Sequence, residues 1–265
     1  MNAPTTVRVI RAAAPSSNTV HALRKLTITE GRLFLRDPAA AFFTLAFPML
    51  LLAVLGSVPA FRRATPKLHG LSTIEVYAPV MVVFTLVMLA MNGMAPVLTS
   101  YREKGILRRL SASPAPAATI LGALVTLYAI VAVVSLLLVA MVGRLAFHIA
   151  LPQAPLAFLV AFVLAAASLF AVGLLLAALA PSAKAGNAIG IAFFFPLMFF
   201  SGLWVPRDLM PGMLRRIGDF IPSGAATQAV LDAWHGRWPQ GGDLATMAVF
   251  ALVAGCAAAK LFRWE

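Results

Sequence analysis

The chain has 265 residues, of which 61% are hydrophobic and only 11% are charged. Soluble domains carry roughly 25% charged residues, so a chain this apolar lacks the polar side chains needed to cover a surface in water. The composition excludes an ordinary soluble enzyme and predicts an all-α membrane protein, because a helix satisfies its own backbone hydrogen bonds in lipid. The net charge of +12 could indicate nucleic acid or an anionic membrane. Because the charges lie between apolar runs, we expect a lipid bilayer as partner and no nucleic acid.

Residues 20–37, ahead of the first apolar run, are expected to form an amphipathic helix on the membrane surface. At 100° per residue its apolar side chains share one arc and basic side chains lie opposite, where they can meet anionic lipid headgroups. The apolar set is Val20, Leu23, Leu26, Leu33 and Phe34, and the basic set is Lys25, Arg32 and Arg36. Glu30 falls on the apolar arc. A disordered basic tail is the alternative for this segment, and it is the prediction for residues 1–18.

Six apolar runs have about the length needed to cross a bilayer as helices. They are Ala39–Val58, Val76–Leu98, Ala118–Gly143, Leu156–Ala180, Ala188–Leu203 and Leu244–Leu261. We therefore expect a single transmembrane domain over residues 19–265. Of the 21 Lys and Arg residues, 13 fall on the side of the chain termini and 8 on the other side. This bias predicts a protein of the cell membrane with both termini in the cytoplasm.

The predicted spans hold almost no group that could carry chemistry. Between their boundaries there is no Asp, Glu, Lys, Arg or His apart from Lys260, near the end of the last span. Proton relays, intramembrane proteases and metal sites need such groups, so we expect no catalytic residue and no metal, and a secondary transporter is disfavoured. The chain also lacks the phosphate-binding pattern G-x-x-x-x-G-K-[ST]. We therefore expect no cofactor on this chain, and energy for uphill transport would come from a partner.

The loop at residues 99–117, between the second and third spans, is the best candidate for a partner surface. Read as a helix, it places Glu103, Ile106, Leu107 and Leu110 on one arc, apart from its basic side chains. An apolar strip that includes one carboxylate is typical of a surface that docks another protein. The alternative is an ordinary loop whose positive charges serve only topology.

The second and fifth spans carry side chains that could line a path for flat, apolar molecules. Asn92 is polar, and leaving a buried amide unpaired costs about 1–3 kcal/mol, so this residue is expected to find a partner. The candidate path consists of Met88, Asn92, Phe195, Met198 and Phe199, and simple packing is the alternative for each. Gly186 and Gly190 form a small-x-x-x-small pattern that could pack a dimer, although packing within the chain is favoured.

Residues 204–243, between the fifth and sixth spans, are too long for an ordinary connection without structure of its own. Helical spacing of apolar residues begins at Leu209 and ends at Phe220, and Ala225–Trp234 could form a second short helix. The alternative is a loose surface hairpin.

Two segments resemble the type-two exporter permeases of the ATP-binding-cassette superfamily, and among them the daunorubicin-resistance-type drug exporters. The first, YREKGILRRLSASPAP, is similar to the family pattern E-R-E-x-G-x-x-x-x-L-x-x-x-P, with Tyr101 where acidic or other polar residues are common. The second, Phe193–Val230, contains a Ser-Gly step, Pro206, Met210-Pro211 and Pro222. The resemblance extends over the whole chain.

The resemblance implies a membrane subunit that pairs with a second copy or a paralogue and binds a separate cytoplasmic P-loop ATPase, which would hold ATP and Mg. The docking residues in loop 99–117 would be Tyr101, Arg102, Glu103, Gly105, Ile106, Leu107, Arg108 and Leu110. Short helices in residues 204–243 would re-enter the outer leaflet and cap the exit. The gate residues would be Ser201, Gly202, Pro206, Met210, Pro211 and Pro222.

The function expected from this reading is ATP-driven export of a hydrophobic or amphipathic small molecule, such as a drug, an antibiotic or a lipid. Export of a polysaccharide or a lipid-linked glycan is one alternative. A membrane scaffold protein without transport activity is the other.

Overall fold

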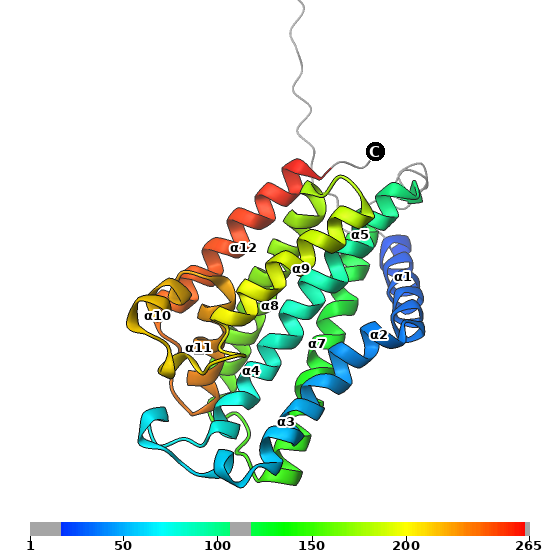
Figure 1. Ribbon diagram of the computed structural model, residues 1–265. Helices are drawn as coiled ribbons and strands as arrows, with labels where there is room; N and C mark the ends of the chain where they lie inside the picture. Colours follow the sequence, from blue (N-terminus) through cyan, green and yellow to red (C-terminus); the bar gives the residue numbers. More distant parts are fainter. Residues whose placement is uncertain (1–16, 107–117, 263–265) are drawn as a thin grey trace, which may run out of the picture.

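The computed structural model describes residues 17–106 and 118–262, which form a bundle of helices (Figure 1). Within these described residues, six helices are long and apolar enough to cross a membrane: Pro38–Ser57, Thr73–Glu103, Thr119–Phe147, Pro155–Leu179, Ala183–Phe200 and Gly241–Leu261. Each overlaps one of the predicted spans, so the prediction of an all-α chain with six apolar spans is confirmed. The predictions made for residues 1–16 and for Leu107, Arg108 and Leu110 lie outside the described residues.

The first two spans are each built from three helical segments, and the other four are single helices. The first consists of α2 (Pro38–Ala41), the π-helical turn η1 (Phe42–Ala46) and α3 (Phe47–Ser57). The second consists of α4 (Thr73–Met88), the π-helical turn η4 (Leu89–Met94) and α5 (Ala95–Glu103). The remaining spans are α7 (Ala118–Phe147), α8 (Pro155–Leu179), α9 (Ala183–Phe200) and α12 (Gly241–Leu261).

The two π-helical turns have a common cause in a proline that follows each of them. In a regular helix the ring of Pro48 or Pro96 would clash with the carbonyl four residues earlier, and a wider turn relieves this clash. The carbonyl of Thr44, in η1, accepts a hydrogen bond of 3.3 Å from the Ser135 hydroxyl of α7. The same hydroxyl lies 2.8 Å from the hydroxyl of Thr85 in α4. The deformation thus gives the first three spans a shared polar contact in the core.

The second span is the most buried of the six spans. In its most apolar window 89% of the residues are buried, against 50% or less in each of the other spans. α4 begins with a capping box, in which the Glu75 side chain accepts hydrogen bonds from the Ser72 backbone and hydroxyl at 2.8 and 2.7 Å. The second span contacts α3, α7, α8, α9 and α11 (Pro222–Trp234).

Gly186 and Gly190 face the second span of their own chain, which is the packing within the chain that the sequence favoured. A Cβ on Gly186 would lie 2.5 Å from the Thr99 hydroxyl oxygen, and one on Gly190 would lie 2.2 Å from the carbonyl oxygen of Met91. No real side chain fits at such distances. The glycines are therefore needed for the close approach of α9 to η4 and α5.

Helix α1 (Ser17–Arg36) precedes the first span and packs against α7. Its most buried described side chain is Glu30, which is 7% exposed, whereas Val20 and Leu33 of the predicted apolar arc are 56% and 49% exposed. Asp37 ends α1 and caps α2 by accepting a 3.0 Å hydrogen bond from the amide of Ala40. A helix is therefore present close to the predicted range, and its location at a membrane surface stays a prediction.

The segment between the fifth and sixth spans is largely helical and lies at the end of the bundle away from the C-terminus (Figure 1). It contains η5 (Arg207–Leu209), α10 (Gly212–Asp219) and α11 (Pro222–Trp234). Nearly all of α11 is buried among α4, α8, α9 and α12. We call the end of the bundle that carries α10 and α11 the opposite end. We call the other end, where α12 ends at Leu261, the terminus end. Re-entry of these helices into a leaflet stays a prediction.

Candidate functional site

Three consecutive residues at the end of α5 each contact a different helix of the same chain. The first is Tyr101, whose hydroxyl donates to the carboxylate of Glu30 in α1, with oxygen distances of 2.9 and 2.8 Å. The hydrogen bond joins residues 71 positions apart in the sequence. It fixes α1 to the terminus end of the central span.

Arg102 contacts the last turn of α8. Its guanidinium donates to the carbonyl oxygens of Ala177 and Ala178 at 3.5 and 3.4 Å, and it also donates to the carbonyl oxygen of Ala180. The last carbonyls of a helix have no partner within the helix and carry its partial negative charge. A cation at this position is therefore favourable, and it ties α5 to the end of the fourth span.

Glu103 contacts the first turn of α9. Its carboxylate accepts a hydrogen bond of 2.8 Å from the backbone amide of Ala183, beside the cap that Ser182 provides through the amide of Ala185. The first amides of a helix are free donors at its positive end, so a carboxylate is favourable there. Arg102 and Glu103 thus hold both sides of the α8–α9 turn, each with the charge that suits the helix end it meets. We call Tyr101, Arg102 and Glu103 the 101–103 clamp.

The remaining residues assigned to docking are only partly described. Gly105 has a φ of +66°, a left-handed conformation that suits glycine and ends α5. Ile106 is half-buried against the core, and Lys104 is exposed. Residues 107–117 lie outside the described part. In the part that is described, Tyr101, Arg102 and Glu103 contact other helices of the same chain.

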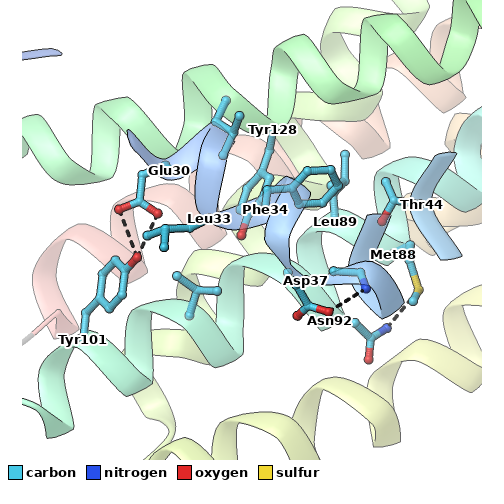
Figure 2. A pocket seen from close by; sticks show the side chains of 14 residues that line it. Glu30, Leu33, Phe34, Asp37, Thr44, Met88, Leu89, Asn92, Tyr101 and Tyr128 are labelled. Atoms are coloured by element: carbon cyan, nitrogen blue, oxygen red, sulfur yellow. Dashed lines mark hydrogen bonds between the residues drawn. The ribbon is translucent and has the colours of Figure 1, made fainter. Parts of the chain in front are cut away.

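A pocket of about 250 Å³ lies between α1 and the first three spans. Figure 2 shows Glu30 and Tyr101 at one end of this pocket and Asp37 and Asn92 at the other. Burial raises the pKa of the Glu30 carboxyl above its ordinary value, and the hydrogen bond from Tyr101 acts in the opposite direction. We call it the acidic pocket, because Glu30 and Asp37 are the charged residues among those described that line it.

A second, larger pocket of about 540 Å³ lies between the first, second and fifth spans. We call it the aromatic pocket, because most of its wall is aromatic: Phe43, Phe47, Tyr77, Phe84, Phe194, Phe195 and Trp204. Met88 and Asn92 line both pockets, and the Asn92 amide donates to the Met88 sulfur at 3.4 Å. This pair therefore stands where the acidic and aromatic pockets meet.

The structure divides the residues proposed for the cargo path into two groups. Met88, Asn92 and Phe195 line the aromatic pocket, and Phe195 is 54% exposed. Met198 is fully buried in the core, and neither it nor Phe199 is among the residues that line the pocket. The sequence missed the aromatic residues of the first span, Phe43 and Phe47, although their clustering around Pro48 was visible.

The residues proposed as an outer gate lie at the turns of the opposite end. Ser201 is fully buried and donates to the Met198 carbonyl at 2.8 Å, and Gly202, with φ of +87°, ends α9. Pro206, Pro211 and Pro222 stand at the starts of η5, α10 and α11. Met210 is 7% exposed. These residues therefore shape the chain path at this end.

A polar pocket of about 680 Å³ opens beside those turns. Arg207, 6% exposed, forms an ion pair with Asp219, and Arg237 donates to Asp232 at 2.7 Å. One carboxylate oxygen of Asp243 is buried without a hydrogen-bond partner in the described part of the chain. The opposite end thus carries a charged network that the hydropathy pattern did not reveal.

The fold and its site define an integral membrane protein with a helical bundle, aromatic and acidic pockets, and a charged clamp at the terminus end. A family model of ABC-2 type transporters matches residues 21–233, and the chain belongs to this family. The match runs from α1 to the last turn of α11 and so includes the clamp and the aromatic pocket. The chain is therefore a membrane transport permease. No curated protein matches the chain significantly.

Proposed function

We propose that this chain is the membrane subunit of an ATP-driven exporter, and that a separate P-loop ATPase docks on loop 99–117 in the cytoplasm. ATP and Mg would be bound by that partner. Both termini would be cytoplasmic in the cell membrane, in line with the excess of Lys and Arg on their side. The family match supports a transport subunit, and the lack of a phosphate-binding loop motivates the separate source of energy.

The observation that carries this proposal is the 101–103 clamp. The clamp immediately precedes the proposed docking residues, and its side chains contact α1, α8 and α9. A displacement of the loop by a bound ATPase would therefore move the terminus ends of several spans together. Motions of this kind, in which packed helices shift as units, are the usual way in which a local event changes access to a site.

The aromatic pocket supports a hydrophobic or amphipathic cargo. Its wall is made almost entirely of aromatic and aliphatic side chains, and Asn92 contributes a single amide. Apolar pockets with few polar groups are typical of sites for small apolar molecules. A polysaccharide or lipid-linked glycan would need many more hydrogen-bonding partners, so the pocket favours a drug, an antibiotic or a lipid over that alternative. A drug-efflux role of the daunorubicin-resistance type follows as a proposal from the same feature.

The exposed face of α9 supports pairing with a second permease copy, either identical or paralogous. Ile191 and Phe195, one turn apart on this helix, are 44% and 54% exposed, and both line the aromatic pocket. A second copy that covered this face would enclose the cargo between two chains. The outer helices α10 and α11 would then cap the exit.

The experiment that tests the proposal starts from the tagged chain, isolated in mild detergent from the membranes of its source cells. We expect a P-loop ATPase to copurify, and we expect ATP-dependent transport when the two are reconstituted together. The purified chain alone should hydrolyse no ATP. A non-transporting scaffold protein would give no transport with any copurified partner. Robust ATP hydrolysis by the isolated chain would refute the proposal that a separate subunit hydrolyses ATP.

A further inference from the structure

The acidic pocket has a charge opposite to that of the chain as a whole. The chain carries a net charge of +12, yet Glu30 and Asp37 line the pocket and none of the described lining residues is Lys, Arg or His. Its wall otherwise consists of apolar side chains, two tyrosines, Thr44 and Asn92. A cavity that is negative at its polar points and apolar elsewhere is complementary to a cation attached to an apolar body.

Glu30 lacks a cationic partner among the described residues. Its carboxylate is 7% exposed and accepts hydrogen bonds from Tyr101, and it takes part in none of the ion pairs of the described chain. Buried charges are normally paired, because taking an ion out of water is costly. An ammonium group in the pocket would supply the missing partner.

Tyr128 gives a second, independent indication of a ligand. Its side chain is 3% exposed, and its hydroxyl makes no hydrogen bond to another described residue. Figure 2 shows this hydroxyl directed into the pocket, between Glu30 and Asp37. A hydroxyl that faces a cavity and has no partner among the described residues is available to hydrogen-bond a bound molecule.

We propose that the acidic pocket binds a compact organic amine in its protonated form, with the ammonium group at Glu30, Tyr101 and Tyr128 and the apolar body along Leu33, Phe34 and Met88. That this amine is a transported cargo rests on the proposed function, whereas the binding site itself does not. Because Met88 and Asn92 also line the aromatic pocket, the site would stand beside the cargo path. A volume of about 250 Å³ admits a one-ring amine and is below the 300–1,000 Å³ that drug-sized ligands occupy.

An ammonium group could also come from a lipid headgroup such as phosphatidylethanolamine. That headgroup carries a phosphate, and the described lining offers no basic side chain to meet it. The pocket therefore favours a free amine over an aminophospholipid.

The test uses the purified full chain in phosphatidylcholine nanodiscs at pH 7, without any ATPase. Equilibrium dialysis compares radiolabelled 4-phenylbutylamine, a cation, with 4-phenylbutan-1-ol, its neutral counterpart, and empty nanodiscs correct for partition into lipid. We expect saturable binding of the amine. Glu30→Gln should weaken it about tenfold or more, as expected for a charge-assisted hydrogen bond, and should leave binding of the alcohol unchanged.

Two further variants keep the test decisive. Tyr128→Phe removes only a hydroxyl and should weaken amine binding about threefold or more, as expected for one hydrogen bond. Glu75→Gln is the matched control, because it removes a carboxylate outside the pocket and glutamine can keep the capping box. It should bind the amine as the unmodified chain does.

Equal amine binding by the unmodified chain and Glu30→Gln, or no saturable binding at all, would overturn the inference. If adding phosphatidylethanolamine to the nanodiscs abolishes amine binding, the ligand of the pocket is the lipid headgroup and not a free amine. The proposed function fails separately. If amine binding depends on Glu30 but the reconstituted complex shows no ATP-driven transport, the amine site is supported and the proposed export function is refuted. If the complex transports a neutral cargo but the chain binds no amine, the export function is supported and the amine site is refuted.

Discussion

The two ends of the bundle are held together by different kinds of contact. At the terminus end, Tyr101, Arg102 and Glu103 reach from α5 to three other helices through polar groups, and the Glu103 side chain is exposed. At the opposite end, α11 is buried among four spans, and Ser223 donates to the Leu197 carbonyl at 2.7 Å. The exposed Glu103 contact can exchange readily with water, whereas a buried helix cannot move without opening the core. We therefore expect a docked partner to displace the terminus end more readily than the opposite end.

The largest effect should come from overpacking the opposite end. A Cβ on Gly224 of α11 would lie 2.2 Å from the Gly218 carbonyl oxygen and 2.3 Å from the Arg207 guanidinium. Gly224→Leu should therefore lower the free energy of unfolding by about 3 kcal/mol, the upper part of the usual range for overpacking. Thermal unfolding in detergent, followed by tryptophan fluorescence, measures this loss. Gly212→Leu is the control, since a Cβ added there would meet no atom within 4 Å, and equal stability of the two variants would contradict the comparison.

The sequence predicted the spans well because each is a long apolar run, and hydropathy alone fixes that pattern. The clamp could not be predicted in this way, since Arg102 and Ala180 are 78 positions apart and meet only when α5 packs beside α8. Glu30 did carry a signal, because a carboxylate on an apolar arc needs a reason, and the acidic pocket supplies one. The π-helical turns were also visible in principle at Pro48 and Pro96, whereas the docking role of every residue in loop 99–117 stays a prediction.

A smaller effect on stability is expected from breaking the clamp. Glu103→Lys removes the hydrogen bond to the Ala183 amide and puts a cation at the positive end of α9, which should cost about 1 kcal/mol. The protein should still fold, but ATP-driven transport by the reconstituted complex should fall far more than the amount of folded protein. Lys104→Glu is the matched control, because it reverses a charge at the adjacent exposed residue. Full transport by Glu103→Lys would show that the clamp is only a structural contact.

The smallest effect concerns the pH dependence of stability. The pKa of Glu30 is raised in the folded chain above its ordinary value of 4.5, so the folded state holds this proton more tightly than the unfolded state. Its contribution therefore favours folding at low pH and is lost as the pH rises above 4.5 through the raised pKa. The melting temperature of the unmodified chain should fall relative to that of Glu30→Gln over this range. A difference between the two that does not change with pH would contradict this account.

The central claim is that the clamp carries the motion of the docked ATPase to the α8–α9 turn as one unit. Glu103→Cys combined with Ala183→Cys, in a Cys256→Ser background, replaces the contact by two thiols that a short bifunctional reagent can join. We predict that transport by the reconstituted complex is low before cross-linking and rises after it, because the covalent link restores the connection. Glu103→Cys without the second cysteine should show no rise with the same reagent. Cross-linking that abolishes the remaining transport would show that α5 and α9 must separate, and would contradict the account.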